Sequence, residues 1–151
     1  MARLSEFREI LGSSRSIYLD VNVFIYHLED RLPYSELTSL IFDGMDGGKI
    51  AGQTSTLSLL ELNVKPHQLG QTNRTLSNAA LLKNMPGLFI HPLTLEMADR
   101  AAQLRAKYRL KTPDAIHLAC AIECQCEIMV GNDKDLRRIK EIRYLWLDDF
   151  L

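Results

Sequence analysis

Four acidic residues stand where the sequence would bring them together in a folded chain. Asp20 directly follows the apolar run "IYL", and Asp133 comes shortly after the apolar run "IMVG". Glu61 lies early in the helical stretch "TLSLLELNV", and Asp114 follows the dipeptide "TP". Close carboxylates repel and raise one another's pKa unless a cation neutralises them. The four residues therefore indicate a metal site.

Metal-assisted hydrolysis is the chemistry that such a cluster can do. Mg²⁺ and Mn²⁺ take carboxylate oxygens as ligands, keep several waters and bridge readily to phosphate. One ion can activate a water molecule, and the same or a second ion can stabilise charge on the leaving oxygen. These roles predict one or two Mg²⁺ or Mn²⁺ ions and a phosphodiester substrate.

Alternating apolar and amphipathic segments predict the elements that must position these acids. Strands are predicted at residues 16–19, 49–54, 88–93, 127–131 and 143–147. Helices are predicted at residues 3–11, after Asn22 as N-cap, at 34–45, after Ser55 as N-cap, at 68–84, at 94–108 and after Thr112 as N-cap. This alternation predicts an α/β fold with a mostly parallel sheet and helices on both faces. The carboxyl ends of parallel strands share one edge, where α/β proteins place ligands and catalytic groups.

Length and composition predict one globular domain over residues 1–151, with residues 1–14 as an added N-terminal helix. No apolar run approaches the roughly 18 residues of a membrane span. Glu6 and Glu9 interrupt the segment where a signal peptide needs an apolar core, which predicts a cytoplasmic protein. A formal net charge of −1 argues against a protein that coats nucleic acid by bulk electrostatics.

The three cysteines, Cys120, Cys124 and Cys126, leave an odd thiol and suit no disulfide framework, so we expect them to be reduced. His117, Cys120 and Cys124 could share one helix face and offer three ligands to zinc, although a fourth ligand is missing nearby. Small side chains that pack in a core helix are the favoured interpretation.

Four segments of the chain resemble the motifs of a known nuclease family. They are "YLDVNVFIYHLE", "TSTLSLLEL", "TPDAIHLACA" and "VGNDKDL". In order and spacing they are similar to the four motifs of PIN-domain nucleases, most closely the VapC-type toxin ribonucleases. The resemblance covers residues 16 to about 147. It implies a three-layer α/β/α sandwich, metal-dependent cleavage of RNA, frequent homodimers and, in bacterial and archaeal members, a small antitoxin partner.

Position by position, the resemblance assigns the acidic quartet to Asp20, Glu61, Asp114 and Asp133. It implies that Asp20, Asp114 and Asp133 hold the ions, while Glu61 binds metal or orients the attacking water. Water then displaces the 3′ oxygen, so the product keeps a 5′ phosphate and a 3′ hydroxyl. An antitoxin could insert an Arg or Lys among these carboxylates in place of the metal charge.

Further positions support or depart from the family's pattern. Asn22 matches the polar residue beside the first acid, and Asp135 matches a frequent but less constant acid. Val21 stands where many members have Thr or Ser, so a hydroxyl that could orient the site is absent. Basic residues of the stretches 100–111 and 134–143 are candidates to contact RNA phosphates. These candidates are Arg105, Lys107, Arg109, Lys111, Lys134 and Arg137.

Three alternative functions are compatible with parts of this pattern. A non-catalytic RNA-binding or partner-binding module would keep the acids only as structure. A nuclease of this class could also act on DNA or structured nucleic acid, because phosphate contacts do not report the sugar. The segment "DVNVF" resembles the signature of haloacid dehalogenase-like phosphatases, but Asn22 occupies the position of their acid and cannot donate a proton.

Overall fold

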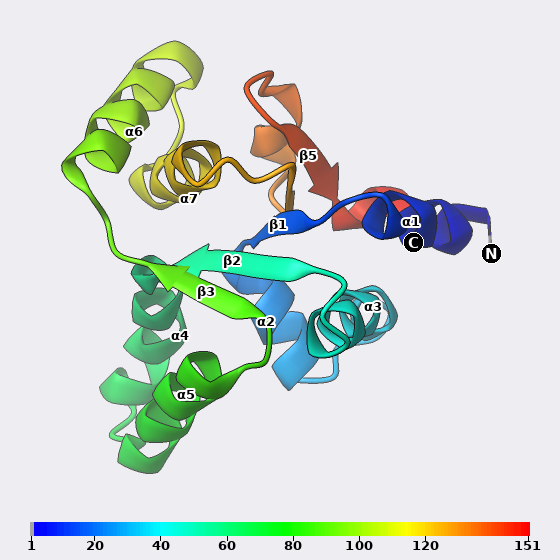
Figure 1. Cartoon of the computed structure of the whole chain (residues 1–151). Helices are drawn as coiled ribbons and strands as arrows, with labels where there is room; N and C mark the ends of the chain where they lie inside the picture. Colours follow the sequence, from blue (N-terminus) through cyan, green and yellow to red (C-terminus); the bar gives the residue numbers. More distant parts are fainter. Residues whose placement is uncertain (1) are drawn as a thin grey trace.

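The computed structural model describes residues 2–151, which form a central sheet of five parallel strands (Figure 1). Met1, the first residue of the predicted domain, lies outside the described residues. The strands are β1 (Ser16–Leu19), β2 (Ala51–Ser55), β3 (Leu88–His91), β4 (Ile128–Gly131) and β5 (Arg143–Trp146). They lie in the order β3-β2-β1-β4-β5, and each pairing is parallel. The predicted parallel α/β sheet is confirmed, with β1 at its centre.

Helices cover both faces of the sheet, as predicted. They are α1 (Ala2–Gly12), α2 (Val21–Leu28), α3 (Tyr34–Asp46), α4 (Thr56–Gln68), α5 (Thr72–Asn84), α6 (Leu95–Tyr108) and α7 (Thr112–Glu123), with short 3₁₀ segments η1 (Lys134–Arg138) and η2 (Leu147–Phe150). Figure 1 shows α6 and α7 on one side of the sheet and α2 to α5 on the other. Within residues 2–151, none of the helices has the length and apolar character needed to cross a membrane.

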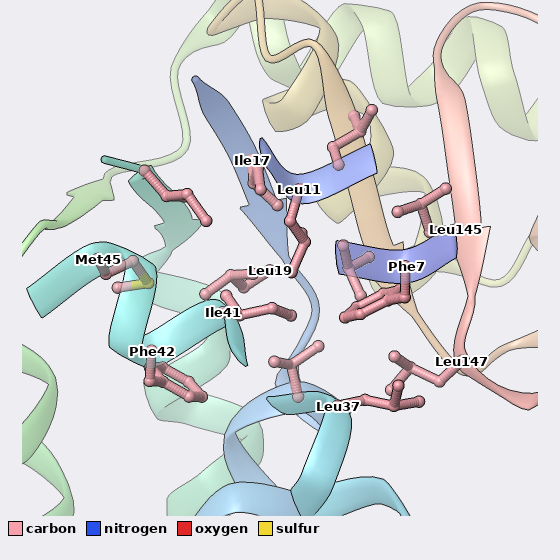
Figure 2. Close-up of a cluster of buried hydrophobic side chains, with 14 of the residues drawn as sticks. Phe7, Leu11, Ile17, Leu19, Leu37, Ile41, Phe42, Met45, Leu145 and Leu147 are labelled. Atoms are coloured by element: carbon pink, nitrogen blue, oxygen red, sulfur yellow. The ribbon is translucent and has the colours of Figure 1, made fainter. Parts of the chain in front are cut away.

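Alternate residues of the central strand enter two separate cores. Ile17 and Leu19 join the larger cluster, in which Figure 2 shows Phe7 and Ile41 packed against the same side of the sheet. Tyr18, between them, enters the second cluster with residues of α6 and α7. Because both faces of β1 are buried, its residues 17–19 are continuously apolar rather than alternating. Tyr18 is thereby placed on the α7 side of the sheet, close in sequence to Asp20.

The boundary between the helix predicted after Ser55 and the helix predicted over 68–84 differs from the prediction. There, α4 continues to Gln68, a short turn follows, and α5 begins at Thr72. Gly70 in this turn has φ +66°, a conformation that glycine adopts without a Cβ clash. The left-handed turn separates the two predicted helices a few residues later than expected, and α4 and α5 pack side by side.

The carboxyl ends of three strands deliver side chains to one edge of the sheet. Asp20 follows β1, Thr56 opens α4 directly after β2, and Asp133 comes after β4. The Asp20 N–H donates a hydrogen bond to the Val130 carbonyl at 3.1 Å, which joins the ends of β1 and β4. This edge is where the candidate site lies.

Candidate active site

Asp20 lies at the end of β1 and caps the helix that follows. Its Oδ1 accepts a hydrogen bond from the Val21 N–H at 2.6 Å. The prediction that Asn22 caps this helix is wrong, because the Asp20 side chain already reaches the first free amide and Asn22 lies within α2. Asp20 is 4% exposed, so its carboxylate is both fixed in direction and largely removed from water.

Glu61 reaches the same edge from α4 and meets a histidine there. Ser55 caps α4, as predicted, by accepting a hydrogen bond from the Leu57 N–H at 3.0 Å. Glu61 Oε1 lies 2.5 Å from His117 Nε2, and Asp20 Oδ1 lies 3.7 Å from the same nitrogen. A ring nitrogen so close to a carboxylate oxygen carries a proton, so His117 donates to Glu61.

His117 is a site residue that the sequence did not connect with the acids. It is 1% exposed, and its Nδ1 lies 2.7 Å from the Tyr18 hydroxyl. Its spacing from Asp114, one turn earlier on the same helix, is the signal that could have found it. Among residues 2–151, the ligand atoms of Asp20, Glu61 and His117 form a group within 4.8 Å of one another, close enough to hold one metal ion.

The zinc face considered for His117, Cys120 and Cys124 does not form among these described residues. His117 turns toward the acids, while the Sγ atoms of Cys120 and Cys124 lie 3.9 Å apart. All three cysteines are free, as expected. Burial raises the pKa of the Cys120 thiol to about 12, which keeps it protonated within the core.

Asp114 lies in the first turn of α7, beside Asp133. The helix begins at Thr112 with Lys111 as its N-cap, so the predicted N-cap at Thr112 is one residue too late. Burial, a hydrogen bond with Asp133 and the charges of Asp133 and Asp20 raise the pKa of Asp114 to about 7. Asp114 therefore shares a proton or a cation with its neighbours at neutral pH.

Asp133 lies in the loop after β4, which hydrogen bonds hold on both sides. Its N–H donates to the Tyr144 hydroxyl at 3.0 Å, and its Oδ1 accepts from the Asp135 N–H at 2.8 Å. Asp135 thus contacts Asp133 through its main-chain amide, and Asp135 itself is exposed. Asn132, which sequence reasoning treated as a turn former, anchors the loop because its Oδ1 accepts from the Asp148 N–H at 3.2 Å.

One buried cation partly compensates these acids. Burial raises the pKa of Asp20, and the charge of His117 opposes that shift. Burial disfavours the imidazolium, yet the hydrogen bond to Glu61 and the charges of Asp20, Glu61 and Asp114 together raise the pKa of His117. The carboxylates still outnumber the imidazolium. A set of carboxylate oxygens with surplus negative charge fits a hard divalent ion such as Mg²⁺ or Mn²⁺.

Comparison with protein families identifies the family to which the chain belongs. A family model described as PIN domain matches residues 17–142, which span all four acids. The chain belongs to the PIN domain family. The resemblance noted from the four sequence motifs is thereby confirmed for this PIN domain.

Solved structures similar to this PIN domain include a toxin–antitoxin complex, a VapBC complex and a VapC toxin. A toxin-antitoxin complex from Klebsiella pneumoniae has 22% identity, covers 87% of this chain and 97% of its own, and has a TM-score of 0.63. VapBC2 from Rickettsia felis, bound to a promoter DNA fragment, has 15% identity, coverage of 86% and 97%, and a TM-score of 0.66. VapC20 from Mycobacterium tuberculosis, described as a sarcin-ricin loop cleaving toxin, has 14% identity, coverage of 84% and 98%, and a TM-score of 0.63. At these identities the similarity shows the fold. No curated protein matches the chain.

The basic residues of this PIN domain differ in how free they are to bind phosphate. Arg105 Nε donates to the Leu110 carbonyl at 2.9 Å, and Lys107 Nζ donates to Glu141 at 3.0 Å. The Arg137 guanidinium lies 4.3 Å from the centre of the Trp146 ring and 3.8 Å from Asp149. Other candidates lie in exposed positions: Arg109 ends α6, Lys111 caps the helix that carries Asp114, and Lys134 directly follows Asp133.

Proposed function

We propose that this PIN domain is a metal-dependent endoribonuclease and the toxin component of a toxin–antitoxin pair. The proposal rests on one observation above all: Asp20, Glu61, Asp114 and Asp133 come to the same edge of the sheet from separate elements. Membership of the PIN family and the similarity to structures of VapC toxins support it. The RNA substrate and the divalent ion are parts of the proposal.

Each acid has a role that follows from its setting. Asp20, Asp114 and Asp133 hold Mg²⁺ or Mn²⁺, which when bound supplies charge stabilisation at the leaving oxygen and a more acidic water. The Glu61 side chain is 25% exposed, so it can orient the attacking water at the mouth of the site. Asn22, in the first turn of α2, and Asp135, whose N–H holds Asp133, are the proposed supporting residues. The exposed lysines Lys111 and Lys134 hold phosphates on either side.

An Asp20→Asn variant tests the proposed activity directly. Asparagine keeps the size of the side chain and can still accept the Val21 N–H, so the fold should persist while the negative charge is lost. We expect cleavage of a pool of structured RNAs to fall by about 10²–10⁴-fold, the scale of a disrupted metal site. Asp46→Asn, which changes an exposed acid at the end of α3, is the matched control.

The same assay is repeated with Mg²⁺, with Mn²⁺ and with EDTA. Cleavage that needs a divalent ion and is lost only in Asp20→Asn supports the nuclease. Wild-type protein that binds RNA but leaves it intact with every metal refutes the nuclease and favours the binding module. Cleavage of DNA in preference to RNA would instead correct the substrate.

The antitoxin and the homodimer belong to the same proposal. Expression of the chain alone should slow growth, and co-expression with the product of a small neighbouring gene should restore it. Light scattering of the purified protein then measures whether it is a dimer. Normal growth at high expression, with no small protein co-purifying, would contradict the toxin assignment while leaving the nuclease open.

A further inference from the structure

A buried tyrosine and histidine link the core of the sheet to the acids at its edge. Tyr18 is fully buried on the α7 side of β1, and its hydroxyl lies 2.7 Å from His117 Nδ1. The opposite ring nitrogen, Nε2, lies 2.5 Å from Glu61 Oε1. The imidazole is thus held at both ends, by a strand residue on one side and by a site residue on the other.

The two contacts leave the imidazole little freedom to rotate. The ring is 1% exposed and stands edge-on to the Tyr18 ring, with 5.7 Å between ring centroids. A flip of the ring would break both hydrogen bonds inside the protein, where no water can replace them. Nε2 also carries the proton that it donates to Glu61, so this nitrogen is not free to bind an ion.

Glu61 depends on such a contact more than Asp20 and Asp133 do. Asp20 is fixed by the Val21 amide, and Asp133 by the amide of Asp135. The Glu61 carboxylate stands at the end of a longer side chain that is 25% exposed, and its hydrogen bond is to His117. The direction of this carboxylate therefore depends on a ring that is itself fixed by Tyr18.

We propose that Tyr18 and His117 form a buried positioning pair that aims the Glu61 carboxylate at the reaction site. Neither residue touches the RNA, since both are buried, and neither belongs to the acidic quartet. The inference rests on the proposed nuclease function. It adds that the reaction depends on the Tyr18 hydroxyl and the His117 imidazole, which lie behind the acids.

Three variants separate positioning from simple packing. His117→Leu removes the donor, His117→Gln returns an N–H near the position of Nε2, and Tyr18→Phe removes only the hydroxyl. We expect His117→Leu to lower kcat by about 10–100-fold, as loss of a supporting hydrogen bond does in metal sites, with KM almost unchanged. His117→Gln should recover most of this loss, and Tyr18→Phe should lie between Gln and wild type. Thr75→Val is the control, because it removes a buried 2.7 Å hydroxyl bond, to the Thr72 carbonyl on α5.

Two spectroscopic measurements do not depend on activity. In the metal-free protein, the short His117–Glu61 bond should give a downfield proton resonance that disappears in Glu61→Gln and persists in Thr75→Val. In the Mn²⁺-loaded protein, pulsed EPR should detect no nitrogen coupling from His117. These results stand even if no RNA substrate is found, so failure of the nuclease proposal is distinguishable from failure of the positioning pair.

Several outcomes would overturn the inference. A folded His117→Leu protein that cleaves RNA like wild type would show that Glu61 needs no holder. A Gln variant as slow as the Leu variant would show that the donor is not what matters. A nitrogen coupling to Mn²⁺ that is lost in His117→Leu would make His117 a metal ligand instead.

Discussion

The candidate site has two halves that handle negative charge in different ways. The first half, called the buried half after Asp20, consists of the buried Asp20 and the partly exposed Glu61, which face the imidazole of His117. The outer half consists of Asp114 and Asp133, two carboxyl groups that face each other. For the first half, the fold provides the imidazole of His117, whose pKa the nearby acids raise. In the second half the acids are left to share a proton, as the pKa of about 7 for Asp114 indicates.

This difference indicates where a metal ion has most to contribute. In the buried half, the imidazolium offsets part of the cost of burying Asp20. In the outer half, a divalent ion would remove the repulsion between Asp114 and Asp133 without a proton. We therefore expect the chain to fold without metal, because its deepest acid is partly compensated by His117, and we expect the outer acids to bind the ion.

Gly131→Ala should have the largest effect on stability, because the methyl group enters between the two halves. An added Cβ would lie 2.8 Å from the Tyr144 hydroxyl, 3.0 Å from Asp20 Oδ2 and 3.1 Å from Asp20 Cβ. Tyr144 would have to release the Asp133 N–H, and Asp20 would have to shift. We expect a loss of about 1–3 kcal/mol in the free energy of unfolding, measured in urea, together with weaker cleavage.

The control for this prediction is Gly12→Ala at the end of α1. A Cβ at Gly12 would meet nothing within 4 Å, so the change should be neutral or slightly stabilising. Equal stability of the two alanine variants would mean that the edge between Asp20 and Tyr144 is looser than its distances indicate.

The sequence was sufficient for the sheet and for the convergence of the acids. The strand at residues 16–19 is β1 with the predicted bounds, and Ser55 caps α4 as expected. Local patterns carry this information, because buried parallel strands are short apolar runs and caps are polar residues before helices. The catalytic roles of Asp20, Glu61, Asp114 and Asp133 remain predictions.

Two kinds of feature could not be read from the sequence. Helix starts at Asp20 and Lys111 differ from the predicted caps at Asn22 and Thr112 by one or two residues, because several polar residues compete for the same amides. The contact of His117 with Tyr18 joins residues 99 positions apart. It depends on how α7 packs on β1, which no local pattern specifies.

The outer half predicts how stability depends on pH in the metal-free protein. The pKa of Asp114 rises from 3.8 to about 7 on folding, so the folded state binds more protons between these values. Stability should therefore fall as pH increases from about 4 to about 7. The raised pKa values of Asp20 and His117 act in the same direction, because each group also holds its proton more tightly when folded.

Asp114→Asn should flatten part of this slope and raise the free energy of unfolding by about 1 kcal/mol above neutral pH. Urea unfolding at several pH values, with and without Mg²⁺, measures the free energy of unfolding and its pH slope. Asp46→Asn is the control variant. Mg²⁺ should stabilise wild type more than the variant. An unchanged pH slope in Asp114→Asn would place the proton exchange in the buried half and reverse the contrast between the two halves.

The smallest effects should come from the lysines beside the outer half. Lys111 and Lys134 lie next to the segments that carry Asp114 and Asp133, and both lie in exposed positions. Each alanine variant should weaken RNA binding modestly, reduce the salt dependence by about one unit of slope, and leave kcat for bound RNA unchanged. Lys83→Ala on α5 is the control. If kcat falls instead, these lysines act on the charge of the outer acids, and the outer half has a cation of its own.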